Sequence, residues 1–147
     1  MGLLGLAMEA AAQDVATIQF ASDTLTYPEA SGSGSTPVLQ TGVTIWETTG
    51  TLTGFPSFLL RGTDGTAKRG TDYNLGSNRY NLREYAHYDT SFSFSSAGVW
   101  TYPNGDDGPD KQFTWKIQKY NSNDKRYNLG SRTTATVIIR DDDPTVV

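Results

Sequence analysis

The sequence contains no cysteine and a single histidine. Without cysteine a disulfide framework is impossible, so stability must come from an ordinary core, from a metal or from assembly partners. No run reaches the roughly 18 apolar residues that a membrane-spanning helix requires. Lysine and arginine are in the minority, since the formal net charge is −4. A chain of this charge is poorly suited to hold the phosphates of nucleic acid.

The first 13 residues are apolar and end in small residues, which gives them some likeness to a secretion signal. They have no basic start, however, and Glu9 interrupts the apolar stretch. We therefore expect residues 1–13 to form a short helix or an arm docked on a partner. Residues 14–147 are expected to form one domain, the number that this length favours.

From residue 15 onward, short segments rich in β-branched and aromatic residues alternate with polar residues. Clusters of Gly, Asn, Asp, Ser and Pro separate these segments and are typical of turns. The segments are residues 17–20, 43–46, 91–94, 113–117 and 134–139. Period-2 alternation with frequent turns predicts an all-β protein, an antiparallel β-sandwich of two sheets with one face of each sheet buried.

Two identical pentapeptides, Tyr-Asn-Leu-Gly-Ser, occur at residues 73–77 and 127–131. Repeat proteins use units of about 20 residues or more, so we expect the pentapeptides to mark two similar turns. The stretch from residue 70 to residue 89 is rich in Asn, Arg and Tyr. It is longer than a sandwich loop needs to be, and long loops on rigid scaffolds often carry contacts with partners.

Exposed tyrosines and arginines in this stretch have the composition of a protein interface, with a twisted edge hairpin as the alternative. Among the tryptophans, Trp46 and Trp115 are expected in the core, whereas Trp100 is the one that we allow as a contact residue. The predicted partner-binding residues are Arg79, Tyr80, Arg83, Tyr85, Tyr88 and Trp100.

Three consecutive carboxylates at residues 141–143 follow a β-branched strand at residues 135–140. Adjacent like charges repel, so they require either solvent and salt on a loose tail or a hard divalent cation. A second acidic stretch contains Asp106, Asp107 and Asp110, and its Asn-Gly-Asp-Asp-Gly-Pro context also suits a simple turn. Both alternatives stay open for both stretches.

The loop that begins at Asp64 contains a second aspartate, Asp72, and glycines at Gly65 and Gly70. Aspartate side chains readily accept hydrogen bonds from nearby backbone amides, so we expect both to cap this loop. The glycines are expected to supply backbone torsions that other residues resist.

The order of these motifs resembles that of the Calx-beta domain family. Residues 64–73, Asp-Gly-Thr-Ala-Lys-Arg-Gly-Thr-Asp-Tyr, resemble the DGTA-x-x-G-x-DY signature of that family, and residues 135–143 resemble its final strand with the terminal DDD. Weaker matches lie in the same order at residues 15–20, 25–29, 93–98 and 106–113. The resemblance covers about residues 15–144, nearly the whole chain.

The resemblance implies a seven-stranded, immunoglobulin-like sandwich. In calcium-binding members the ions lie at one end, held by loop carboxylates, and Ca²⁺ takes about six to eight oxygen ligands. One departure is Lys111, which stands where the family pattern has an acid and limits the expectation to one ion or none. The metal ligands that the resemblance implies are Glu29, Asp64, Asp106, Asp107, Asp110, Asp141, Asp142 and Asp143.

No catalytic residues are predicted, because His87 has no accompanying nucleophile motif or paired carboxylate. The sequence therefore favours a non-enzymatic structural or binding module that contacts other protein subunits, without nucleic acid or membrane insertion. Two settings are predicted. The first is a virion surface, as a capsid decoration or cement protein of a phage; the alternative is an extracellular, calcium-dependent adhesion or matrix module at a cell surface.

Overall fold

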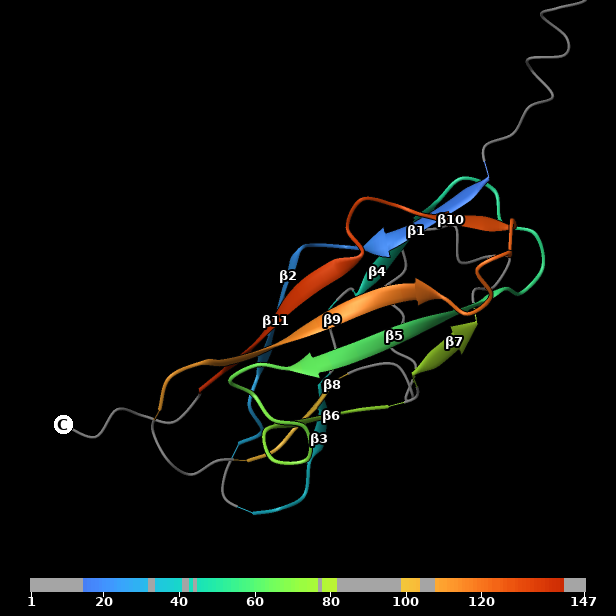
Figure 1. Ribbon diagram of the computed structural model, residues 1–147. Coiled ribbons are helices and arrows are strands. Elements are labelled where there is room, and N and C mark those ends of the chain that lie inside the picture. The colour runs from blue at the N-terminus through green and yellow to red at the C-terminus, as the bar shows by residue number, and fades with distance from the viewer. Residues whose placement is uncertain are drawn as a thin grey trace, which may run out of the picture.

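Eleven strands make up the regular structure of the described residues, and no helix occurs among them (Figure 1). This computed structural model describes residues 15–31, 34–40, 43, 45–76, 78–81, 99–103 and 108–141. In chain order the strands are β1 (Ala16–Phe20), β2 (Thr24–Pro28), β3 (Val38–Gln40), β4 (Trp46–Thr49), β5 (Ser57–Asp64), β6 (Tyr73–Leu75), β7 (Arg79–Asn81), β8 (Val99–Thr101), β9 (Lys111–Lys119), β10 (Tyr127–Leu129) and β11 (Thr134–Arg140). The expected N-terminal arm, residues 1–13, lies outside the described residues. Within the described part of the chain, no helix has the length and hydropathy of a membrane span.

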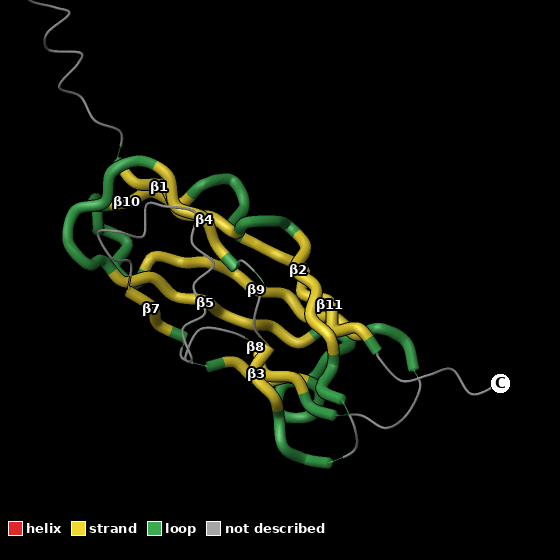
Figure 2. The backbone as a smooth tube through the Cα atoms, turned by 180° about the vertical axis from the view of Figure 1, so that it is seen from behind, coloured by secondary structure: helices red, strands yellow, loops and turns green. Residues whose placement is uncertain are grey.

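The strands form two layers, seen from the front in Figure 1 and from behind in Figure 2. One layer is a five-stranded sheet in the order β2-β11-β9-β5-β7. The other consists of two three-stranded sheets, β10-β1-β4 and β3-β8-β6. Aromatic rings join the layers. The ring centres of Trp46 in β4 and Phe58 in β5 lie 5.1 Å apart, and the stacked rings of Tyr73 in β6 and Phe113 in β9 lie 3.8 Å apart, centre to centre. The predicted all-β sandwich is confirmed, but its second layer is divided into two sheets, and the described strands number eleven and not the seven that the resemblance implied.

The chain changes layer between β1 and β2, which are consecutive in sequence. Strand β1 pairs in parallel with β10, and β2 pairs in parallel with β11. The sequence predicted an antiparallel sandwich, and the other strand pairings are indeed antiparallel. Parallel pairs arise here because β1 and β2 each join a strand that comes much later in the chain, a pairing that local patterning does not reveal.

Burial follows the period-2 pattern that the sequence shows. In β9 the side chains of Phe113, Trp115 and Ile117 are buried, whereas the alternate positions are exposed or half-buried. Phe20 of β1 lies 6.0 Å from Trp115, ring centre to ring centre. Trp46 is also buried, as predicted. These aromatic residues fill the space between the layers, and each buries a large apolar area.

The repeated Tyr-Asn-Leu segments are strands, not the turns that the sequence predicted. They form β6 and β10, and both tyrosines are fully buried. Each phenol donates a hydrogen bond to one end of β5, because Tyr127 bonds the carbonyl oxygen of Ser57 at 2.8 Å and Tyr73 bonds Asp64 Oδ1 at 2.6 Å. The same local sequence therefore supports opposite ends of β5.

The two glycines of the loop after β5 are required for different reasons. Gly70 adopts φ of +86°, a left-handed conformation that favours glycine, as predicted. Gly65 has no positive φ, so the predicted torsional role is wrong there. Instead, a Cβ atom at Gly65 would lie 2.5 Å from the backbone oxygen of Gln112, so close approach of the loop to β9 requires the glycine.

We expect Gly65→Ala to lower the free energy of unfolding by about 1–3 kcal/mol, because the loop must move away from β9 to accept the methyl group. Urea denaturation monitored by tryptophan fluorescence measures this change. Gly108→Ala is a matched control, since a Cβ atom there meets nothing within 4 Å, and its effect should stay within about 0.5 kcal/mol. Equal stabilities of the two variants would contradict the steric argument.

Candidate functional site

Four strands begin or end at the same end of the five-stranded sheet. Strand β11 ends beside the end of β2, with Arg140 opposite Pro28, and beside the start of β9. Strand β5 ends there too, with Asp64 opposite Phe113. This end of the molecule, the acidic pole, carries the carboxylates of Glu29, Asp64, Asp72, Asp110 and Asp141. The sequence predicted four of these five as ligands that converge at one end of the sandwich.

Hydrogen bonds connect the segments that precede β9 and follow β11. The backbone N–H of Asp141 donates to Asp110 Oδ1 at 3.0 Å, and the N–H of Gly108 donates to Asp141 Oδ2 at 2.8 Å. Each aspartate thus binds the backbone of the other segment, so the two segments lie side by side. Both predicted acidic stretches include one of these aspartates.

Asp64 caps the loop that follows it, as predicted. Its Oδ1 accepts hydrogen bonds from the phenol of Tyr73 and from the backbone N–H of Arg69 at 3.0 Å. The hydrogen bond from Tyr73, followed by that from Arg69, lowers the pKa of the Asp64 carboxyl from its ordinary value of 3.8. Burial, and then the hydrogen bond to Asp64, raise the pKa of the Tyr73 phenol.

Asp72 forms an ion pair with Lys111, the residue that departs from the family pattern. The Lys111 Nζ lies 2.7 Å from Asp72 Oδ1, and their side chains are 35% and 11% exposed. Asp72 Oδ2 also accepts a hydrogen bond from the backbone N–H of Lys68 at 2.8 Å, so its predicted capping role is confirmed. The chain thereby supplies its own cation at the acidic pole.

Glu29 lies directly after β2 and is the most buried of those predicted ligands that the structure describes, with 8% of its surface exposed. Its backbone N–H donates to the carbonyl oxygen of Arg140 at 2.9 Å, which holds it beside the end of β11. The adjacent Ala30 forms a parallel bridge with Pro103. Glu29 therefore lies between the five-stranded sheet and the segment after β8.

The described carboxylates alone do not make a calcium site. No three acidic or histidine side chains within the described ranges lie close enough together to hold a metal ion. Oxygens of Asp64, Asp110 and Asp141 accept hydrogen bonds from the protein, whereas Ca²⁺ takes about six to eight oxygens. The remaining predicted ligands, which lie outside the described residues, are Asp106, Asp107, Asp142 and Asp143.

The predicted partner-binding residues that the structure describes lie in both layers. Arg79 of β7 is exposed, and its guanidinium carbon lies 3.9 Å from the centre of the Tyr120 ring. Trp100 of β8 is half-buried. Tyr80 was expected to be exposed, and this is wrong: it is 7% exposed and packs on Trp46 and Phe58 because strand alternation turns it inward. Burial raises the pKa of its phenol to about 12. Arg83, Tyr85, Tyr88 and His87 lie outside the described residues.

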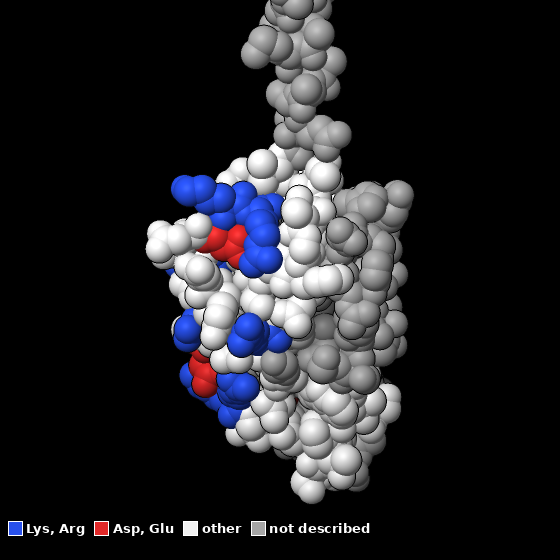
Figure 3. Space-filling model, turned by 90° about the vertical axis from the view of Figure 1, so that its right-hand side faces the viewer, with Lys and Arg blue, Asp and Glu red and all other residues white. Residues whose placement is uncertain are grey.

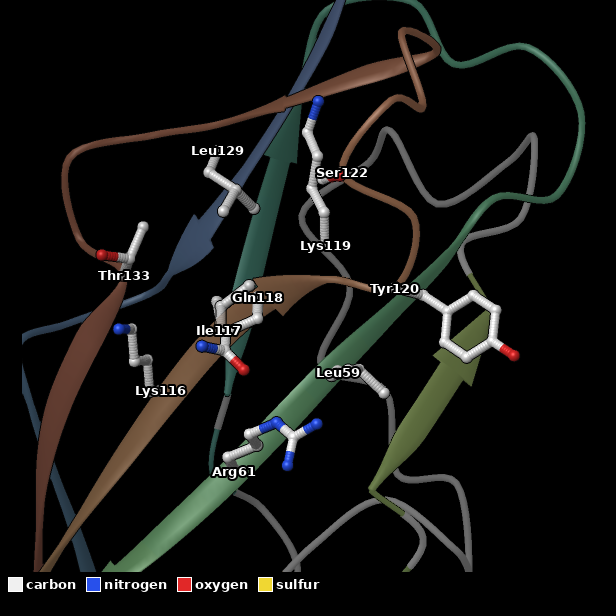
Figure 4. A pocket seen from close by; sticks show the side chains of 10 residues that line it. All are labelled: Leu59, Arg61, Lys116, Ile117, Gln118, Lys119, Tyr120, Ser122, Leu129 and Thr133. Atoms are coloured by element: carbon white, nitrogen blue, oxygen red, sulfur yellow. The ribbon is translucent and has the colours of Figure 1, made fainter.

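The sequence analysis missed a groove on the outer face of the five-stranded sheet, with a volume of about 620 Å³ (Figure 4). It lies toward the end of β9 that is remote from the acidic pole, because β9 begins at Lys111 and ends at Lys119. We call it the basic groove. Its lining residues are Leu59, Arg61, Lys116, Ile117, Gln118, Lys119, Tyr120, Ser122, Leu129 and Thr133. Alternation predicts that Lys116 faces outward. That Arg61 of β5 lies opposite it depends on the strand register, which the sequence does not reveal.

These observations define a class of protein, a two-layer β-sandwich with carboxylate-bearing loops at one pole. Residues 11–80 match the family model of the Calx-beta domain. The fold is similar to the crystal structure of the apo form of the Calx CBD1 domain, with a TM-score of 0.59, 21% identity, and coverage of 88% of this chain and all of the other. The resemblance to Calx-beta domains that the motifs carry is confirmed.

A second similar structure is that of CBD12 from CALX1.2, with a TM-score of 0.50 and 19% identity. The match covers 86% of this chain but only 44% of that longer chain. No curated protein sequence matches the chain. At these identities the structural likeness establishes the fold, whereas the ligand set of this chain has to be argued from its own residues.

We expect Tyr73→Phe to raise the pKa of Asp64 toward 3.8, because it removes the strongest hydrogen bond to that carboxylate. A carboxyl whose pKa is lowered by folding stabilises the fold above its unfolded pKa, and this stabilisation is lost as the pH falls through the folded pKa. The variant should therefore be less stable than wild type at pH 7, and the difference should shrink below about pH 4. Urea denaturation from pH 7 to pH 3 measures it.

Tyr127→Phe provides the matched control, because its phenol bonds a backbone carbonyl that does not titrate in this range. Its loss of stability should be the same across the pH series. If the Tyr73→Phe deficit is equally independent of pH, the proposed coupling between Tyr73 and the Asp64 carboxylate is refuted.

Proposed function

We propose that this chain is a non-enzymatic Calx-beta-type binding module whose acidic pole binds a single Ca²⁺ ion. The main support for this site is the pair of hydrogen bonds that connect Gly108 to Asp141 and Asp141 to Asp110. These residues adjoin the remaining carboxylates in sequence, since residues 106–107 precede Gly108 and residues 142–143 follow Asp141. The two acidic stretches therefore enter and leave the sandwich at the same place.

The charges at the acidic pole favour the binding of one calcium ion over the binding of several. Carboxylates on adjacent residues repel, and a hard divalent cation offsets this repulsion by accepting their oxygens as ligands. At the acidic pole, however, Asp72 is already neutralised by Lys111, and Asp64 is occupied by hydrogen bonds. The candidates left for the ion are Glu29 and the aspartates of the two acidic stretches. The positive charge that Lys111 places at this pole favours one bound cation over several.

We further propose that the bound ion fixes the loops of the acidic pole in one arrangement for contact with another protein subunit. Similarity to Calx-beta domains supports the class of module. An extracellular or cell-surface setting, the alternative predicted from the sequence, stays a prediction. A virion surface, predicted from the sequence as the first setting, stays a prediction. Imaging of the native assembly would distinguish the two by showing which subunits surround this chain.

Calcium at millimolar concentration should raise the melting temperature of the protein, because the ion binds the folded state and not the unfolded chain. At 100 times Kd the gain is about 2.7 kcal/mol, which corresponds to a shift of roughly 6–10 °C for a chain of this size. Differential scanning calorimetry in Ca²⁺, in Mg²⁺ and in EDTA measures the effect.

The double variant Asp142→Asn/Asp143→Asn should lose this shift. Asp23→Asn should keep it, because Asp23 is an exposed aspartate that precedes β2, at the opposite end of that strand from the acidic pole. No shift in wild type, or an equal shift with Mg²⁺, would refute the calcium site and leave the fold unaffected.

A further inference from the structure

The outer face of the five-stranded sheet places two cations directly opposite each other. Arg61 of β5 pairs in register with Lys116 of β9, and both side chains are exposed. Neither has a hydrogen bond or an ion pair with any described residue. Like charges at directly opposite positions destabilise a sheet. The folded chain therefore carries an unfavourable pair that its own described residues do not relieve.

No acidic side chain stands among the outward positions of β5 and β9, both of which are fully described. The turn after β9 contains Asp124, whose carboxylate forms a two-pronged ion pair with Arg126 at 3.0 and 2.8 Å. Lys119 bonds the backbone oxygen of Asp124 at 2.6 Å, not its carboxylate. This face is thus basic although the chain has a net charge of −4.

The Lys and Arg atoms gather on one half of the face in Figure 3, with small areas of Asp and Glu among them. This half is the side of the five-stranded sheet, which lies toward the viewer in Figure 1. The Lys and Arg residues that this view colours therefore lie on the side of the five-stranded sheet. Such a concentration attracts a partner of opposite charge and increases the rate of encounter.

The basic groove also contains apolar surface between its cations. Leu59 stands opposite both Arg79 and Gln118, one row along the sheet from the Arg61–Lys116 pair. Tyr120 is 52% exposed, and Arg79 lies over its ring. Figure 4 shows the lining side chains spread around the groove, from Lys116 and Thr133 at one side to Tyr120 at the other. Charged and apolar contacts are therefore available to the same ligand.

We propose that the basic groove binds an acidic, partly apolar peptide segment of a partner protein. Carboxylates of the segment neutralise Arg61 and Lys116, and arginine can hold a carboxylate through two parallel hydrogen bonds. Apolar side chains of the segment cover Leu59 and the Tyr120 ring. A sulfated polysaccharide would match the charge but has no large apolar side chains with which to bury this leucine and ring. The peptide therefore fits the groove better.

Binding of a fluorescein-labelled octapeptide of alternating Asp and Leu tests this proposal by fluorescence anisotropy, in EDTA and at 50 mM salt. We expect Arg61→Gln/Lys116→Gln to weaken binding at least tenfold. The control Lys68→Gln/Arg140→Gln removes the same charge from exposed positions at the acidic pole and should change Kd less than twofold. Raising the salt to 500 mM should also weaken binding, because exposed charges are screened.

The melting temperature separates a binding role from a structural one. Since the Arg61–Lys116 pair is repulsive, the groove variant should melt at the same temperature as wild type or higher. Equal binding of an alternating Asn and Leu peptide would overturn the proposal, as would tight binding of a heparin oligosaccharide without binding of the acidic peptide. Because the assay contains EDTA, its outcome is independent of the calcium site.

Discussion

The antiparallel ladder between β5 and β9 determines where the chemically important side chains lie. Its register runs from Phe58 opposite Lys119 to Asp64 opposite Phe113. With this register, the aromatic residues of β9 face the second layer while Arg61 and Lys116 face outward. A shift by one residue would turn every side chain of the shifted strand to the other face and place cations in the core. The core, the acidic pole and the basic groove therefore depend on the same pairing.

The two Tyr-Asn-Leu strands hold this ladder from the second layer. Tyr73 bonds the end of β5 and Tyr127 bonds its start. Burial raises the pKa of the Tyr127 phenol to about 12, so it remains a hydrogen-bond donor across the physiological range. Fully buried tyrosines provide both apolar packing and one polar contact each, which suits a core built largely from aromatic rings.

Local patterning predicted much of this structure. Alternation in residues 113–117 predicted the buried and exposed faces of β9. The tendency of aspartate to bond nearby backbone amides predicted the capping roles of Asp64 and Asp72. The order of motifs also predicted that strand-end carboxylates converge. The prediction from composition was wrong for Tyr80. A tyrosine near arginines was expected at the surface, whereas the alternation of β7 turns its side chain into the core.

Features that depend on contacts between distant segments were not predictable. The parallel pairing of β1 with β10 joins residues more than 100 positions apart in sequence. The opposition of Arg61 and Lys116 depends on the strand register, and the ion pair between Lys111 and Asp72 depends on where two loops meet. In each case the residue types were visible in the sequence, but their partners were not.

The two parallel pairings have a mechanical consequence. If tension pulls the chain outward from the start of β1 and from the end of β11, the paired strands β2 and β11 are drawn past each other along their length. Their hydrogen bonds lie across the direction of pull, so they are loaded together instead of being opened one after another. A fold of this connectivity resists stretching along its chain more strongly than it resists peeling of an edge strand such as β7.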